Sequence, residues 1–201
     1  MHRINTPLLW HISLDEMKYL YTTHISSNHL DVGVGSGLLL DSVEFPSSNP
    51  RVALLDLNSN SLNFTANRIA RYQPELYRAN ALSRRDIKQC SIPRNFDSIA
   101  CNYLIHCLPG HMHQKAVLFD NMIQLLNPNG VLFGATIVKD GVDQYVLSRV
   151  VNSIFNSLKI FSNYQDTTNT LLEVLSTRFQ KVHVELLGCV ALYSASKLKT
   201  I

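Results

Sequence analysis

Three of the eight glycines in this 201-residue chain stand within five residues of one another. Gly33, Gly35 and Gly37 lie at the end of a β-rich run over residues 29–34 and just after it, and the apolar residues from Leu38 onward are typical of a helix start. In open α/β sheets, ligands bind beyond the carboxyl ends of strands, where a helix N-terminus points at them. Glycine adopts positive φ without a Cβ penalty and lets the backbone approach a ligand closely. The cluster therefore predicts a ligand-binding turn, with a simple tight turn between strand and helix as the alternative.

An acidic residue follows this cluster at a spacing that is typical of nucleoside-binding proteins. Asp56 stands nineteen residues after Gly37, at the end of a second β-rich run over residues 51–57. A carboxylate in that place can accept hydrogen bonds from both vicinal hydroxyls of a ribose. Asp56 could instead cap the next helix, but Ser59 and Asn60 already offer caps. The pattern favours a nucleoside cofactor.

A second acidic residue narrows the choice of cofactor. Asp31 precedes Gly33 by two residues. A carboxylate there would repel the pyrophosphate of a dinucleotide, whereas it would attract an ammonium group. S-adenosylmethionine carries an amino-acid tail, a ribose and an adenine, so the two carboxylates fit it.

The elements that would position these residues alternate between strands and helices. The early strands are continuous apolar runs, which is typical of a parallel sheet that is covered on both faces. The last two runs are separated by a single glycine, Gly188, so they should form an antiparallel hairpin. We therefore expect an α/β fold, a three-layer sandwich around a seven-stranded, mostly parallel sheet. The expected strands cover residues 29–34, 51–57, 75–78, 96–103, 131–138, 181–187 and 189–195.

Three helical patterns with a 3.6-residue period should each bury one apolar stripe against this sheet. The stripes are Leu62, Ala66, Ile69 and Ala70; Met112, Ala116, Phe119, Met122 and Leu126; and Val146, Val150, Ile154 and Leu158. We expect one domain over residues 1–201, with a helical insert at about 141–179 between the fifth and sixth strands. Only about 28 residues precede the first strand, which leaves little chain for an N-terminal lid. The pocket is therefore expected to be open or completed by a partner subunit.

The order of these motifs resembles that of class I, Rossmann-like S-adenosylmethionine-dependent methyltransferases over residues 29–196. The segments that carry the resemblance are 31–37, 55–58, 96–99 and 126–132. Residues 102–110 and 188–192 look more narrowly like small stand-alone microbial methyltransferases that act on small molecules. The resemblance implies that ten residues hold the cofactor: Asp31, Gly33, Gly35 and Gly37 at the methionine part, Asp56 and Leu57 at the ribose and adenine, Asn80 and Ala81 at the adenine edge, and Asn102 and Tyr103 closing the pocket. Asn80 stands where many relatives have Asp, so its contact with adenine is expected to be weaker.

Methyl transfer from a sulfonium needs alignment of the acceptor and, for a hydroxyl, removal of a proton. His106 is the best candidate for a general base, because its ordinary pKa lies near neutrality, and Tyr103 is the second. Either residue could instead be structural. The segment that begins at Asn102 lacks the prolines of the family's amine-methylating motif, and no adjacent Asp-Asn pair follows the fifth strand. We therefore expect metal-independent transfer to a small molecule, mainly by positioning, with the acceptor atom undetermined.

Composition excludes several other classes. The net charge is only +3 and the basic residues are scattered, so nucleic-acid binding is not expected. No membrane span or secretory signal is visible, and the four cysteines lack disulfide or zinc spacing, which favours a cytoplasmic protein with no metal site. Charged residues make up only 16% of the chain, which is compatible with an apolar substrate pocket or a homodimer interface. An NAD(P)-dependent Rossmann oxidoreductase and a non-catalytic partner subunit are the alternative functions.

Overall fold

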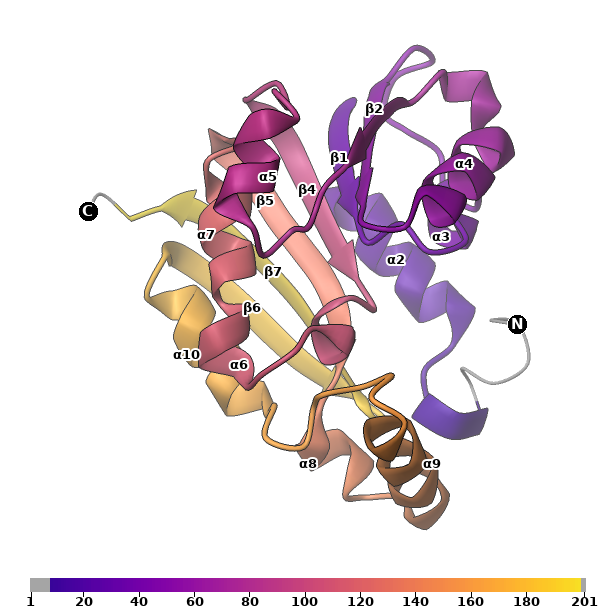
Figure 1. Ribbon diagram of the computed structural model, residues 1–201, viewed down its shortest axis with the longest axis vertical. Helices are drawn as coiled ribbons and strands as arrows, with labels where there is room; N and C mark the ends of the chain where they lie inside the picture. The colour runs from indigo at the N-terminus through magenta and orange to yellow at the C-terminus, as the bar shows by residue number, and fades with distance from the viewer. Residues whose placement is uncertain (1–7, 200–201) are drawn as a thin grey trace.

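The computed structural model describes residues 8–199, which contain one sheet of seven strands (Figure 1). The order across the sheet is β3-β2-β1-β4-β5-β7-β6. Strands β1 to β5 are parallel to one another, and β7 is antiparallel to both β5 and β6. The predicted α/β class and antiparallel C-terminal hairpin are confirmed. The strands are β1 (Asn28–Val32), β2 (Arg51–Asp56), β3 (Glu75–Arg78), β4 (Phe96–Asn102), β5 (Leu126–Ile137), β6 (Phe179–Leu187) and β7 (Val190–Leu198).

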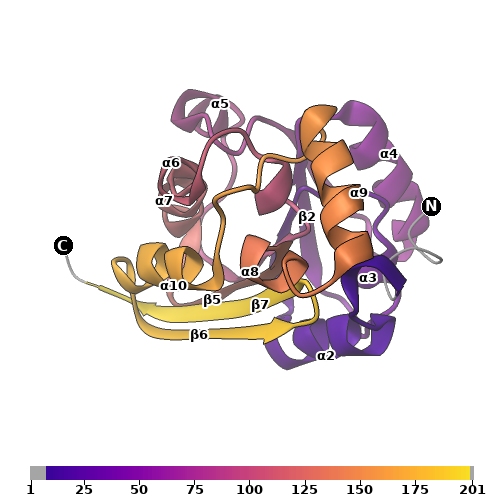
Figure 2. The same cartoon turned by 90° about the horizontal axis from the view of Figure 1, so that it is seen from below.

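Helices cover both faces of the sheet, which gives the three predicted layers (Figure 2). In β2, Ala53 and Leu55 join the core beneath α5, α6, α7 and α10, while Val52 and Leu54 join the core beneath α2, α3 and α4. Burial on both faces explains why this strand is a continuous apolar run. The helical elements are α2 (Leu14–His24), α3 (Leu38–Asp41), α4 (Ser59–Arg68), η1 (Ala70–Tyr72), α5 (Arg84–Gln89), η2 (Ile105–Cys107), α6 (Met112–Lys115), α7 (Val117–Ile123), α8 (Lys139–Val142), α9 (Val146–Ser157) and α10 (Thr168–Ser176).

The helical pattern predicted to end at Leu126 ends earlier, because Leu126 is the first residue of β5 and pairs with Phe96. The predicted helix cap is also displaced. Asn58, not Ser59 or Asn60, caps α4, and its side chain accepts a hydrogen bond of 2.9 Å from the Asn60 N–H.

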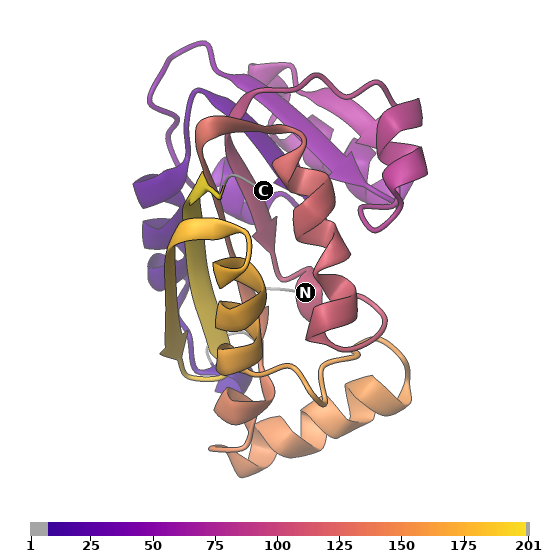
Figure 3. The same cartoon turned by 90° about the vertical axis from the view of Figure 1, so that its left-hand side faces the viewer.

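Helix α9 lies at one end of the molecule, away from the centre of the sheet (Figure 3). The prediction that its apolar stripe packs on the sheet is wrong, because Val146, Val150, Ile154 and Leu158 are all at least half exposed. The helix turns its polar face inward instead, and its buried Ser148 donates a hydrogen bond of 2.6 Å to the Leu9 carbonyl oxygen. A periodic pattern shows that a helix has two faces, but hydrogen bonds decide here which of them is buried. Among residues 8–199, no helix has the length and apolar character that crossing a membrane requires.

Candidate active site

The glycine turn after β1 holds three residues in the left-handed region, with φ of +72° at Gly33, +53° at Gly35 and +65° at Gly37. A Cβ on Gly33 would lie 2.8 Å from Leu104 Cδ1, and one on Gly37 would lie 2.6 Å from Thr65 Cγ2. A Cβ on Gly35 would meet nothing within 4 Å. Packing thus requires the outer two glycines, whereas the middle one borders open space where a ligand can approach the backbone.

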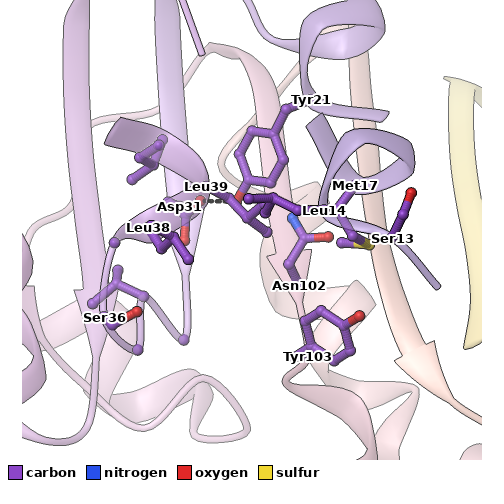
Figure 4. A pocket seen from close by; sticks show the side chains of 15 residues that line it. Ser13, Leu14, Met17, Tyr21, Asp31, Ser36, Leu38, Leu39, Asn102 and Tyr103 are labelled. Atoms are coloured by element: carbon purple, nitrogen blue, oxygen red, sulfur yellow. Dashed lines mark hydrogen bonds between the residues drawn. The ribbon is translucent and has the colours of Figure 1, made fainter. Parts of the chain in front are cut away.

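A pocket of about 200 Å³ opens between this turn, the end of β4 and helix α2 (Figure 4). Ligand pockets commonly measure about 300 to 1,000 Å³, so this one has room for only part of a nucleoside cofactor. Six of the ten predicted cofactor residues line it: Asp31, Gly33, Gly35, Gly37, Asn102 and Tyr103. The structure therefore brings together the residues predicted for the methionine part.

The charge at the bottom of the pocket belongs to Asp31, which is 3% exposed. Its Oδ2 accepts a hydrogen bond of 2.6 Å from Tyr21 Oη, and His29 Nε2 lies 3.8 Å away. Within residues 8–199, no lysine or arginine forms an ion pair with this carboxylate. A buried carboxylate without a permanent cation is costly, so an ammonium group entering the pocket would supply the missing charge.

Two polar side chains at the end of β4 also lack partners. Both amide atoms of Asn102 and the hydroxyl of Tyr103 are buried without a hydrogen bond among the described residues. Tyr103 also has φ of +51°, which costs energy for a residue with a side chain. Burial raises the pKa of Tyr103, and the Glu16 carboxylate adds to this, so the phenol stays protonated and can donate a hydrogen bond. These unpaired groups fit the ammonium and carboxylate of an amino-acid tail.

The residues predicted for ribose and adenine lie at the carboxyl ends of the parallel strands, as the pocket does, but they do not line this pocket. Asp56 ends β2, and its Oδ1 accepts a hydrogen bond of 2.8 Å from the Asn58 N–H. Leu57 is exposed, and Ala81 is buried. Asn80 Oδ1 accepts a hydrogen bond of 3.0 Å from the Leu82 N–H, so its free group is the amide nitrogen. The ribose and adenine roles of these four residues stay predictions.

Sequence reasoning missed one wall of the pocket, which helix α2 supplies through Ser13, Leu14, Met17 and Tyr21. The sequence left little chain for an N-terminal lid, yet this short arm does supply a wall of the pocket. Ser13 and Glu16 form a capping box, a signal that does mark the helix start in the sequence. Nothing in the pattern places that helix beside the glycine turn, because the contact is tertiary.

Comparison with known proteins identifies the family. A family described as "Methyltransferase domain" matches residues 30–132. Demethylluteothin O-methyltransferase of Streptomyces thioluteus is 35% identical, over 94% of this chain and 80% of its own length. This chain belongs to the methyltransferase family. Methyltransferase ctvB of Aspergillus terreus is 31% identical, over 98% of the chain and 87% of its own length.

A solved structure agrees with this assignment at the level of fold. The N-methyltransferase NodS of Bradyrhizobium japonicum, in complex with S-adenosyl-L-homocysteine, has a TM-score of 0.62 at 15% identity, covering 91% of this chain and 84% of its own. The expected class I, S-adenosylmethionine-dependent methyltransferase is confirmed.

The position of His106 does not support the role of general base in this methyltransferase. It is 3% exposed and does not line the pocket. Its Nδ1 accepts a hydrogen bond of 3.4 Å from the Ile137 N–H, and its ring packs edge-on against Phe161. Burial, with a smaller contribution from the positive charge of Lys115, lowers the pKa of His106 to about 3. The side chain is therefore neutral and weakly basic at neutral pH, and it joins η2 to the end of β5.

The ribose role of Asp56 in the methyltransferase can be tested with Asp56→Ala. We expect the affinity for S-adenosylhomocysteine to fall about 10- to 150-fold, as for the loss of about 1.5 to 3 kcal/mol of charge-assisted hydrogen bonding. Isothermal titration calorimetry measures it. Asp56→Asn is the matched control, since it removes the charge but keeps an oxygen for the Asn58 N–H. Unchanged affinity in Asp56→Ala would show that Asp56 serves only the turn.

Proposed function

We propose that this methyltransferase transfers a methyl group from S-adenosylmethionine to a hydroxyl oxygen of a small molecule, without a metal and without a general base from the protein. The choice of oxygen is supported by relatives named O-methyltransferases, among them that of Streptomyces thioluteus and the physcion biosynthesis cluster O-methyltransferase of Aspergillus chevalieri. The same support favours an acceptor from small-molecule biosynthesis.

The absence of a suitable base among the described pocket residues carries the second part of the proposal. Tyr103 stays protonated, because burial raises its pKa. Burial and the neighbouring Asp31 carboxylate keep the pKa of Tyr21 well above its ordinary value. Asp31 is the remaining titratable side chain of the lining and would face the cofactor's ammonium group. Rate acceleration would then come from aligning the acceptor with the methyl group.

When bound, S-adenosylmethionine supplies a methyl group on a sulfonium, whose thioether leaving group needs no further activation. The acceptor oxygen forms a bond to the methyl carbon as the carbon–sulfur bond breaks, and the electron pair of that bond goes to sulfur. The hydroxyl proton is released to water. Asp31 and Asn102 would hold the amino-acid tail, Tyr103 would donate a hydrogen bond from the pocket wall, and α2 would cover the site.

If no side chain of the pocket lining acts as a base, the acceptor must ionise in water, so we propose a phenolic or enolic hydroxyl. For a panel of phenols, kcat/KM should rise about tenfold per pH unit below the pKa of each phenol and level off above it. The midpoint should therefore move with the acceptor, and His106→Gln should leave each midpoint in place. Initial rates of S-adenosylhomocysteine formation from pH 6 upward measure both. One fixed midpoint for all phenols would instead reveal a protein base.

The alternatives considered from the sequence have clear tests. The NAD(P)-dependent oxidoreductase is set aside, because the chain belongs to the methyltransferase family. Binding of S-adenosylhomocysteine without turnover of any acceptor in a broad panel would favour the non-catalytic partner subunit. A homodimer and a cytoplasmic location stay predictions.

A further inference from the structure

The side chain of Tyr21 is fixed from two directions beneath the glycine turn. It lies in α2 and is 2% exposed, and its ring packs edge-on against Phe133 with centroids 5.3 Å apart. Its hydroxyl donates a hydrogen bond of 2.6 Å to Asp31 Oδ2, which Figure 4 shows as a dashed line. The ring contact holds the hydroxyl in place, so the hydroxyl in turn fixes the orientation of the carboxylate.

The two oxygens of Asp31 have different surroundings. Oδ2 is taken by Tyr21, and the other polar group near it, His29 Nε2, is too distant for a hydrogen bond at 3.8 Å. His29 is held in its own place, because its Nδ1 lies 2.8 Å from Ser98 Oγ. No side chain or backbone group among residues 8–199 is hydrogen-bonded to Asp31 Oδ1. Tyr21 therefore determines which oxygen remains available on the pocket side.

We propose that Tyr21 is a positioning residue for the methyl donor, which orients Asp31 so that one carboxylate oxygen faces the cofactor's ammonium group. This inference rests on the proposed function, since it requires a cofactor with an ammonium group in this pocket. It also gives α2 a role beyond covering the site, because this helix carries the Tyr21 hydroxyl that orients the Asp31 carboxylate toward the amino-acid tail. Burial keeps the phenol protonated, so the donor persists across the working pH range.

The test uses two ligands that differ in the amino-acid tail. S-adenosylhomocysteine carries the ammonium group, and 5′-methylthioadenosine has the same adenosine and a thioether but no amino-acid part. In Tyr21→Phe, which keeps the ring and removes only the hydroxyl, the affinity for S-adenosylhomocysteine should fall about tenfold or more. The affinity for 5′-methylthioadenosine should stay within about twofold. Calorimetric titration of the full chain measures both.

Tyr193→Phe is the matched control, because Tyr193 is also fully buried and donates a hydrogen bond of 3.1 Å, to the Cys101 carbonyl oxygen, within the core on the other face of the sheet. It should change neither affinity. Equal losses for both ligands in Tyr21→Phe, or no loss for either, would overturn the proposal. Failure of the wild-type chain to bind S-adenosylhomocysteine would instead overturn the proposed function.

A double-mutant cycle tests whether Tyr21 acts through the carboxylate of Asp31. Asp31→Asn should weaken binding of S-adenosylhomocysteine and spare 5′-methylthioadenosine. Adding Tyr21→Phe to Asp31→Asn should then cost little more, because the carboxylate through which Tyr21 acts is already gone. A further tenfold loss in the double variant would show that Tyr21 acts by another route.

Discussion

Gly35→Ala is expected to lower the affinity for S-adenosylhomocysteine by up to about 100-fold while the protein stays folded. A Cβ at this position meets no protein atom within 4 Å, so it would occupy space that the ligand needs, an overpacking cost of about 1 to 3 kcal/mol on binding. The left-handed backbone, with φ of +53°, costs alanine about 1 to 2 kcal/mol of folding stability. Calorimetry gives the affinity, and thermal unfolding gives the stability.

Gly37→Ala tests the packing role of the same turn, because its added Cβ would contact a protein side chain and not open space. It has a similar backbone penalty at φ of +65°, and its Cβ would also lie 2.6 Å from Thr65 Cγ2. We expect a total destabilisation of about 2 to 5 kcal/mol, and Thr65→Ser should restore part of it by removing that methyl group. If Gly35→Ala binds S-adenosylhomocysteine like the wild type, the cluster is only a tight turn.

The second large effect is expected from Lys115→Met, which should lower the free energy of unfolding by about 3 to 5 kcal/mol. Lys115 in α6 and Asp166, which precedes α10, are both fully buried and form an ion pair, and Lys115 Nζ also donates a hydrogen bond of 2.6 Å to the Ser162 carbonyl oxygen. This ion pair links α6, which follows β4, to the segment between α9 and α10. Removing the lysine leaves a buried carboxylate without its cation. For a chain of this size, Tm should fall by roughly 6 to 20 °C.

The double variant Lys115→Met with Asp166→Leu should recover most of this loss, because a buried ion pair can often be replaced by apolar residues of similar volume without net cost. Asp166 Oδ1 already lacks a hydrogen-bond partner among the described residues, which favours the recovery. Chemical denaturation of the wild type and the two variants gives the three free energies. A single variant within 1 kcal/mol of the wild type would show that the pair contributes little to stability.

The sequence was a good guide wherever a local pattern determines the structure. A continuous apolar run such as that of β2 predicted a parallel strand, because a strand that is buried on both faces is apolar at successive positions. The single Gly188 between two runs placed the antiparallel hairpin. The glycine turn and the end of β4 come together because they follow parallel strands, β1 and β4, that are neighbours in the sheet.

Features that depend on tertiary contacts were not predictable in this way. The hydrogen bond from Tyr21 to Asp31 joins a helix to a strand, and no local pattern pairs them. His106 looked like a base because its ordinary pKa is near neutrality, but contact with Phe161 and Ile137 removes it from the pocket. The apolar stripe of α9 has the expected helical period, but it faces solvent and not the sheet. The polar face of the helix is buried instead, because it forms hydrogen bonds inside the protein.

The placement of β7 has a consequence for how this chain is made. This strand follows both β5 and β6 in the chain, yet it lies between them and is hydrogen-bonded to both. During synthesis, β5 has an open edge and β6 has no partner until the last described strand emerges. Unpaired strand edges readily pair with other chains, so the nascent protein is most exposed to misassembly just before β7 appears. Its insertion then closes two open edges in one step.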